Sequence, residues 1–81
     1  MKRNIPPAEG PQDFPTQTGW HWVRWTPEFI EEPVHVVIEG QSASWSYDEG
    51  SDYEEVSAKE CAHDGTVWFY DPGFIERKKS G

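Results

Sequence analysis

The residues with the most potential for chemistry lie in an acidic run from Asp48 to Asp64, which carries seven carboxylates within seventeen residues. Two interpretations stay open: the carboxylates only keep a small protein soluble, or they form a face that binds a basic partner. In the second, an aromatic side chain among the acids anchors the contact. The expected binding residues are Asp48, Glu49, Asp52, Tyr53, Glu54, Glu55 and Glu60, with Tyr53 as the anchor.

Metal binding and catalysis find little support in the sequence. Cys61 and His63 form one pair of ligand types, whereas a structural zinc site needs four ligands. Residues 48–52 lack the spacing of a calcium-binding loop. No sequence pattern of nucleophilic catalysis surrounds Cys61 or His63. We therefore expect no metal ion, no cofactor and no enzymatic activity.

Tryptophan is the other unusual component, because five of the 81 residues are Trp while only 35% of the chain is hydrophobic. Trp20, Trp22 and Trp25 could stack on nucleic-acid bases, but such sites normally have a basic groove. Binding of carbohydrate or of a proline-rich peptide stays open. We expect most of the tryptophans to form the core, with Trp25 or Trp45 as an exposed anchor for a protein partner.

The charge distribution excludes a general nucleic-acid binder, which needs a basic face. The net charge is −8, and between Asn4 and Glu76 there are fifteen acids and only two bases, Arg24 and Lys59. No apolar run reaches the length of about 18–20 residues that spans a membrane. The first ten residues lack the apolar stretch of a signal peptide, and a single cysteine fits a reducing, cytoplasmic location.

Proline and charge divide the chain into three parts. Residues 1–18 contain four prolines and are expected to be an extended or disordered arm. Residues 19–76 are expected to be a single small β-rich domain, and residues 77–81 a basic tail.

Within that domain, alternating β-branched and aromatic residues predict short strands. Residues 19–25 form one strand with aromatics on both faces, and residues 34–39 and 42–47 form a hairpin around Gly40 and Gln41. Residues 66–70 form another strand, while residues 53–62 fit either a short helix or a crossing loop with a strand. The predicted fold is mainly β: an antiparallel sheet of three to four strands, or a partly open barrel, with room for one short helix.

From Gly19 onward, the segments GWHWVRW, PVHVVIEG, SWSYDEG and TVWFYDPGFIE resemble a loose group of short, Trp-rich, acidic phage and prophage proteins. The resemblance implies a viral or mobile-element origin and a small β fold, but no role for any single residue. In size and charge the chain is also similar to phage anti-restriction and anti-CRISPR inhibitors.

Together these features favour an inhibitor whose acidic face imitates the phosphates of DNA and binds a nuclease or CRISPR effector in a bacterial host. The alternative is a phage structural, accessory or adaptor protein, monomeric or homodimeric, that uses a sheet edge or an aromatic patch.

Overall fold

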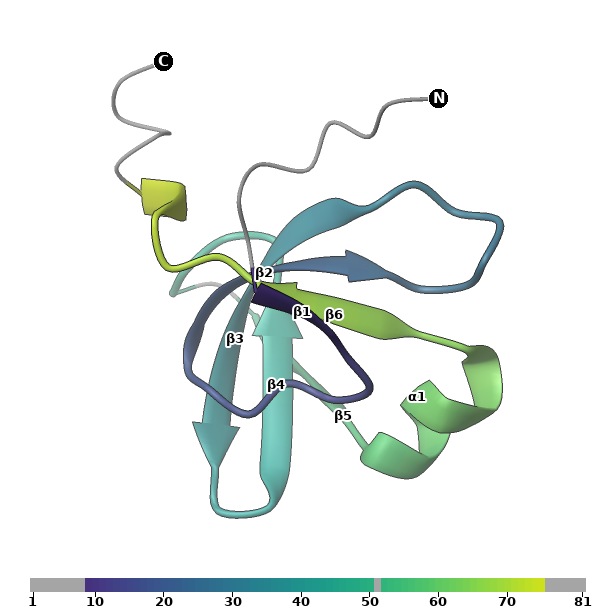
Figure 1. Ribbon diagram of the computed structural model, residues 1–81. Coiled ribbons are helices and arrows are strands. Elements are labelled where there is room, and N and C mark those ends of the chain that lie inside the picture. The colour runs from purple at the N-terminus through teal and green to yellow at the C-terminus, as the bar shows by residue number, and fades with distance from the viewer. Residues whose placement is uncertain (1–8, 51, 76–81) are drawn as a thin grey trace.

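Short β-branched and aromatic segments, separated by glycine and proline, assemble into one antiparallel sheet with a single short helix (Figure 1). The computed structural model describes residues 9–50 and 52–75. Its elements are β1 (Glu9–Gln12), β2 (Gly19–Arg24), β3 (Glu32–Glu39), β4 (Ser42–Ser46), β5 (Glu54–Val56), α1 (Ala58–Asp64) and β6 (Val67–Tyr70). This confirms the mainly β class and the short helix.

The sheet has six strands in the order β1-β6-β2-β3-β4-β5, rather than the three to four expected. The two additional strands, β1 and β5, are its edges. Both are short, and neither segment has a strong strand pattern of its own, so each depends on the backbone groups that β6 and β4 offer. Strand β1 falls in the segment expected to be an arm; residues 1–8 of that arm and the basic tail at 77–81 lie outside the described residues.

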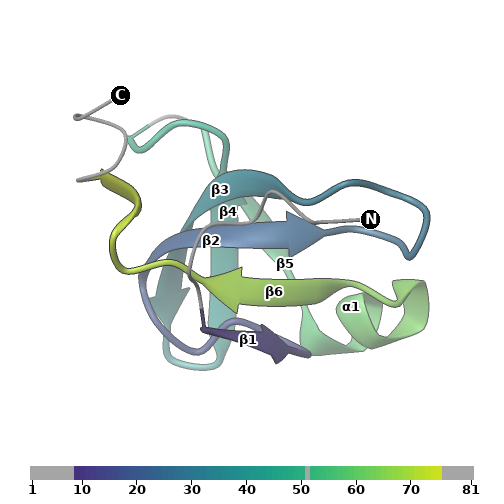
Figure 2. The ribbon, with the colours of Figure 1, turned by 45° about the horizontal axis from the view of Figure 1, so that its top comes forward.

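The predicted hairpin is confirmed, with Val36 opposite Trp45 and Ile38 opposite Ala43. Its two-residue connection requires a positive φ, and Gly40 supplies it at 62°. β3 and β4 run at a steep angle to β2 and β6, so the sheet is strongly twisted and curled (Figures 1 and 2).

The core lies on one face of this curled sheet. Val23, Val34, Val36 and Trp68 are completely buried there. Because α1 connects β5 at one edge with β6 near the other, it crosses this face and adds the buried Cys61. The N-terminus of α1 is capped by Ser57, and its C-terminus ends at Gly65 with φ 77°.

The opposite face carries a second, smaller aromatic layer, formed where the chain after β6 folds back. Phe74 stacks on Trp20 with ring centroids 4.6 Å apart, and Trp22 donates a hydrogen bond of 2.7 Å from Nε1 to the buried Asp71. His35 contacts the edge of Trp20 at 5.3 Å. The prediction that β2 carries aromatics on both faces is thus confirmed. The segment after β6 covers the face opposite the core.

No helix in the described part of the chain is long and apolar enough to cross a membrane.

Candidate functional site

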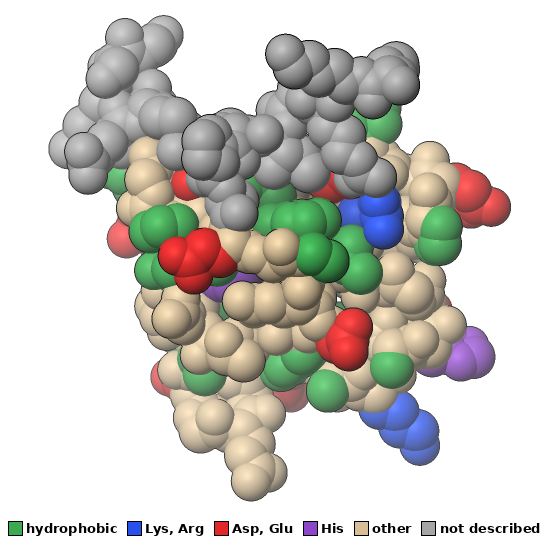
Figure 3. Space-filling model, viewed as in Figure 1, with side chains coloured by type: hydrophobic (Ala, Val, Ile, Leu, Met, Phe, Trp, Pro, Cys, Tyr) green, Lys and Arg blue, Asp and Glu red, His purple; other side chains and the backbone are tan. Residues whose placement is uncertain are grey.

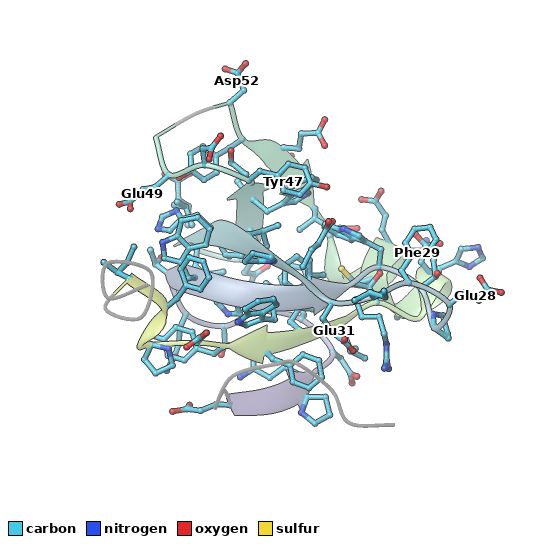
Figure 4. All side chains as sticks on the ribbon, turned by 90° about the horizontal axis from the view of Figure 1, so that it is seen from above. Glu28, Phe29, Glu31, Tyr47, Glu49 and Asp52 are labelled. Carbon is cyan, nitrogen blue, oxygen red and sulfur yellow. The ribbon has the colours of Figure 1, made fainter. Side chains whose placement is uncertain are left out.

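The loop between β4 and β5, residues 47–53, presents three of the six predicted acidic residues. Asp48, Glu49 and Asp52 are exposed. Glu49 and Asp52 extend outward from this loop, and Tyr47 lies at its base (Figure 4). The loop ends at β5, an edge of the sheet, so no strand of the described part of the chain lies beyond β5.

Tyr53, the expected aromatic anchor, is half-buried and fastens this loop to the sheet. Its hydroxyl accepts a hydrogen bond from the Gly50 N–H at 3.1 Å and lies 2.7 Å from Nδ1 of His35. The other ring nitrogen of His35, Nε2, lies 4.0 Å from the carboxylate of Glu49. Tyr53 therefore positions the loop.

Glu54 and Glu55 are both exposed but point to opposite faces of the sheet. Glu54 lies opposite Trp45, on the core-facing side, and Glu55 lies opposite Ser44, on the other side. Two charges on a short edge strand also discourage pairing with a strand of another molecule. The alternation of the strand separates these two predicted binding residues.

Glu60 has a local task in the first turn of α1. The Ser57 hydroxyl accepts a hydrogen bond from the Glu60 N–H at 3.2 Å and donates one to its carboxylate at 3.0 Å. The first of these bonds is the N-cap bond that stabilises the start of the helix, and the second ties the Glu60 carboxylate to the capping hydroxyl. The carboxylate of Glu60 is therefore already engaged.

Four of the seven predicted residues thus gather at one end of the molecule, and we call these four the acidic end: Asp48, Glu49, Asp52 and Glu54. The structure does not place all seven on one face. On the face shown in Figure 3, acidic side chains are likewise separated by neutral surface.

Three residues of the acidic end line a hollow with a volume of about 360 Å³. We call it the acidic hollow; its lining residues are Trp45, Ser46, Tyr47, Asp48, Asp52 and Glu54. The Trp45 and Tyr47 rings meet nearly at right angles, 87° apart in plane, with centroids 5.0 Å apart. Tyr47 is 54% exposed, whereas Trp45 is half-buried. The hollow therefore combines aromatic walls with negative charge.

Glu32 holds the aromatic walls in place. Its Oε2 accepts hydrogen bonds from the Tyr47 hydroxyl, at 2.9 Å, and from Nε1 of Trp25. Trp25 in turn packs against Trp45 with centroids 4.8 Å apart. The hydrogen bond to Glu32 raises the pKa of the Tyr47 hydroxyl, so the phenol stays a protonated donor.

Sequence reasoning missed Glu32, because it stands beside Pro33 and looks like a helix stop. It did name Trp25 and Trp45 as candidate exposed anchors, and both are half-buried in the structure. The available signal for the hollow was that Trp45 and Tyr47 share a face immediately before the acidic run.

Cys61, His63 and the other described histidines do not form a metal site or a nucleophilic centre. Cys61 is buried, and burial raises the pKa of its thiol, so it is not an activated nucleophile. His63 is exposed on α1, and His21 is buried between Trp68 and Tyr70. Within residues 9–50 and 52–75, no group of three or more His, Cys, Asp or Glu side chains is placed to hold a metal ion.

A larger concavity of about 600 Å³ runs along α1. All its lining residues come from this one helix, namely Lys59, Glu60, Ala62, His63 and Asp64. It has a single wall and no aromatic ring, so it offers less to recognise a ligand than the acidic hollow.

A scan against protein-family models, a search of curated proteins and a search of solved structures found no match to this chain. The fold and the site define a small antiparallel β-protein with an aromatic-walled, acidic hollow at one end of its sheet. Its function has to be inferred from that geometry.

Proposed function

We propose that this chain is a binding protein that engages the basic surface of a protein partner through its acidic end. The observation that carries the proposal is that Asp48, Asp52 and Glu54 are exposed around one hollow, and no Lys or Arg of residues 9–50 and 52–75 lines it. Among the described residues, Arg24 pairs with Glu31 at 3.5 Å, and Lys59 lies on α1. The charge of the acidic end is therefore available to a partner.

The partner we propose is a nucleic-acid-handling protein of a bacterial host, such as a nuclease or a CRISPR effector, with the inhibitor acting in the cytoplasm. Its groove would normally bind phosphates, which DNA presents at about one charge per 1.7 Å of axis. Because four of the six predicted carboxylates gather, the acidic end would occupy only a short stretch of such a groove. This action is binding and blocking, with no chemical step.

The test is capture of basic proteins from a nuclease-treated bacterial lysate by the immobilised chain. We expect bound proteins to be released when salt rises from about 50 to about 200 mM, and to be displaced by added duplex DNA. Proteins that stay bound through both treatments would contradict the proposal, because binding would then depend on neither charge nor a shared groove.

A matched pair of variants locates the contact. The first neutralises the acidic end by D48N, E49Q, D52N and E54Q, and we expect it to lose capture. The second removes the same charge from exposed acids elsewhere, by E9Q, D13N, E39Q and D64N, and we expect it to retain capture. Equal loss in both variants would show that only net charge matters and would refute a defined site.

A second candidate function is contact through an apolar patch, as in an adaptor or a homodimer. It is favoured by the loop between β2 and β3, where Phe29 is 57% and Ile30 85% exposed. Phe29 lies with Glu28 at the end of this loop, pointing away from the sheet (Figure 4). A dimer seen by light scattering that persists at high salt and is lost in F29S/I30S would favour this function; a monomer at all concentrations would exclude homodimerisation.

A further inference from the structure

The acidic hollow combines two features that together select a cation. The acidic residues Asp48, Asp52 and Glu54 line it together with the aromatic residues Trp45 and Tyr47. Aromatic rings carry negative charge on their faces and attract a cation placed over them. A purely acidic surface would bind any cation loosely, whereas ring faces favour one that sheds its water easily.

The walls of the hollow are fixed before any ligand arrives. Tyr47 is held by its hydrogen bond to Glu32 and by its edge contact with Trp45. Trp45 is held by Trp25, whose indole donates to the same Glu32 oxygen. On the other side, Tyr53 fastens the loop that carries Asp48 and Asp52. Binding therefore needs little ordering of these groups, and preorganisation of this kind raises affinity.

We propose that the acidic hollow binds the guanidinium group of an arginine side chain presented by the partner. This inference rests on the proposed function for the identity of the partner as a basic protein. Guanidinium is planar and weakly hydrated, so it stacks on an aromatic ring while its five N–H donors reach carboxylates. A volume of about 360 Å³ lies at the lower end of the range for ligand sites, which suits one side chain.

Other ligand classes fit less well. An anion would meet three carboxylates, and an apolar side chain would remove their hydration without replacing it. A lysine ammonium is a strongly hydrated point charge without a flat face, so it gains less from the two rings. The hollow therefore distinguishes arginine from lysine as well as from neutral groups.

The direct test is NMR titration of the full chain with the peptide acetyl-Gly-Arg-Gly-amide. Comparison peptides replace arginine by citrulline, its uncharged isostere, or by lysine. We expect saturable shifts of the Trp45 indole and Tyr47 ring signals, with affinity for arginine about tenfold above that for citrulline and higher than that for lysine. Equal affinity for the citrulline peptide, or shifts that map outside the hollow, would overturn the proposal.

Two matched pairs of variants separate local recognition from general charge. D52N/E54Q should weaken arginine binding about fivefold, whereas E9Q/D13N, with the same charge change elsewhere, should leave it unchanged. Y47L should abolish the preference for arginine over lysine, whereas F29L, at an exposed aromatic outside the hollow, should preserve it. Folding of each variant is checked by the dispersion of its amide signals.

The same variants distinguish failure of this inference from failure of the proposed function. If Y47L keeps capturing basic proteins in a salt-dependent way and keeps its arginine preference, arginine binding in the hollow is refuted and the proposed function stands. If the wild-type chain binds the arginine peptide as described but captures no basic protein, arginine binding in the hollow is supported and the proposed function fails.

Discussion

His21 makes the stability of this protein sensitive to mild acid. Its side chain is completely buried between the rings of Trp68 and Tyr70. Nδ1 donates a hydrogen bond of 3.0 Å to the Gly19 carbonyl oxygen. Burial lowers the pKa of His21 below 6.5; the hydrogen bond to Gly19 opposes this shift, and His35 adds to it.

The sign and size of the effect follow from proton uptake. Below pH 6.5 the unfolded chain binds a proton at His21 that the folded chain does not bind. The stability from the neutral imidazole is therefore complete above pH 6.5 and falls on acidification, by about 1.4 kcal/mol per pH unit, until the folded-state pKa is reached. At pH 5.5 the loss is at most about 1.4 kcal/mol, which lowers Tm by about 5–10 °C in a domain of this size.

The assay is thermal unfolding between pH 7.5 and 5.5, a range in which Asp and Glu of ordinary pKa stay ionised. H21Q should show a shallower dependence of Tm on pH than the wild type, whatever its absolute stability. H63Q removes an exposed imidazole and should retain the wild-type dependence. Identical pH slopes for H21Q and the wild type, or an NMR titration of folded His21 centred at 6.5, would refute the reasoning.

Three further perturbations test the packing, the helix cap and the aromatic walls. W68A removes the largest completely buried side chain and should lower the free energy of unfolding by about 3–5 kcal/mol. That is much of the about 4–12 kcal/mol expected for a domain of this length. Unchanged circular dichroism and melting would contradict the place of Trp68 in the core. S57A removes the cap of α1 and should lower stability by about 1 kcal/mol in denaturant unfolding, with S57D close to wild type. E32Q weakens the hydrogen bond that raises the pKa of Tyr47 and removes the charge that adds to the shift, so one phenol should ionise at lower pH in an ultraviolet titration; an unaltered titration would exclude the contact.

Local pattern was enough to predict the centre of the sheet. The β-branched run at residues 34–39, the glycine at position 40 and the alternation at 42–47 specify a hairpin through neighbours in sequence. The two-sided aromatic pattern of residues 19–25 likewise required cover on both faces, which the core and the chain after β6 provide.

At the edges of the sheet, β1 escaped prediction because its partner is distant in sequence, and β5 was only one of two alternatives for residues 53–62. Glu9–Gln12 pairs with β6, more than fifty residues later, and Glu54–Val56 is a strand only because β4 presents free backbone groups beside it. Neither segment has the composition of a strand on its own, and four prolines obscured the first.

Sequence alone determined the density of carboxylates, the supply of aromatic bulk and the segments that form the central hairpin, because these depend on composition and on near neighbours. Tertiary structure decided what each acidic residue does. In β5 the side chains of Glu54 and Glu55 lie on opposite faces, and at the start of α1 the Glu60 carboxylate is hydrogen-bonded to Ser57. Strand pairing places Glu32 within hydrogen-bond distance of Tyr47. Those outcomes depend on register and crossover, which only the folded chain fixes.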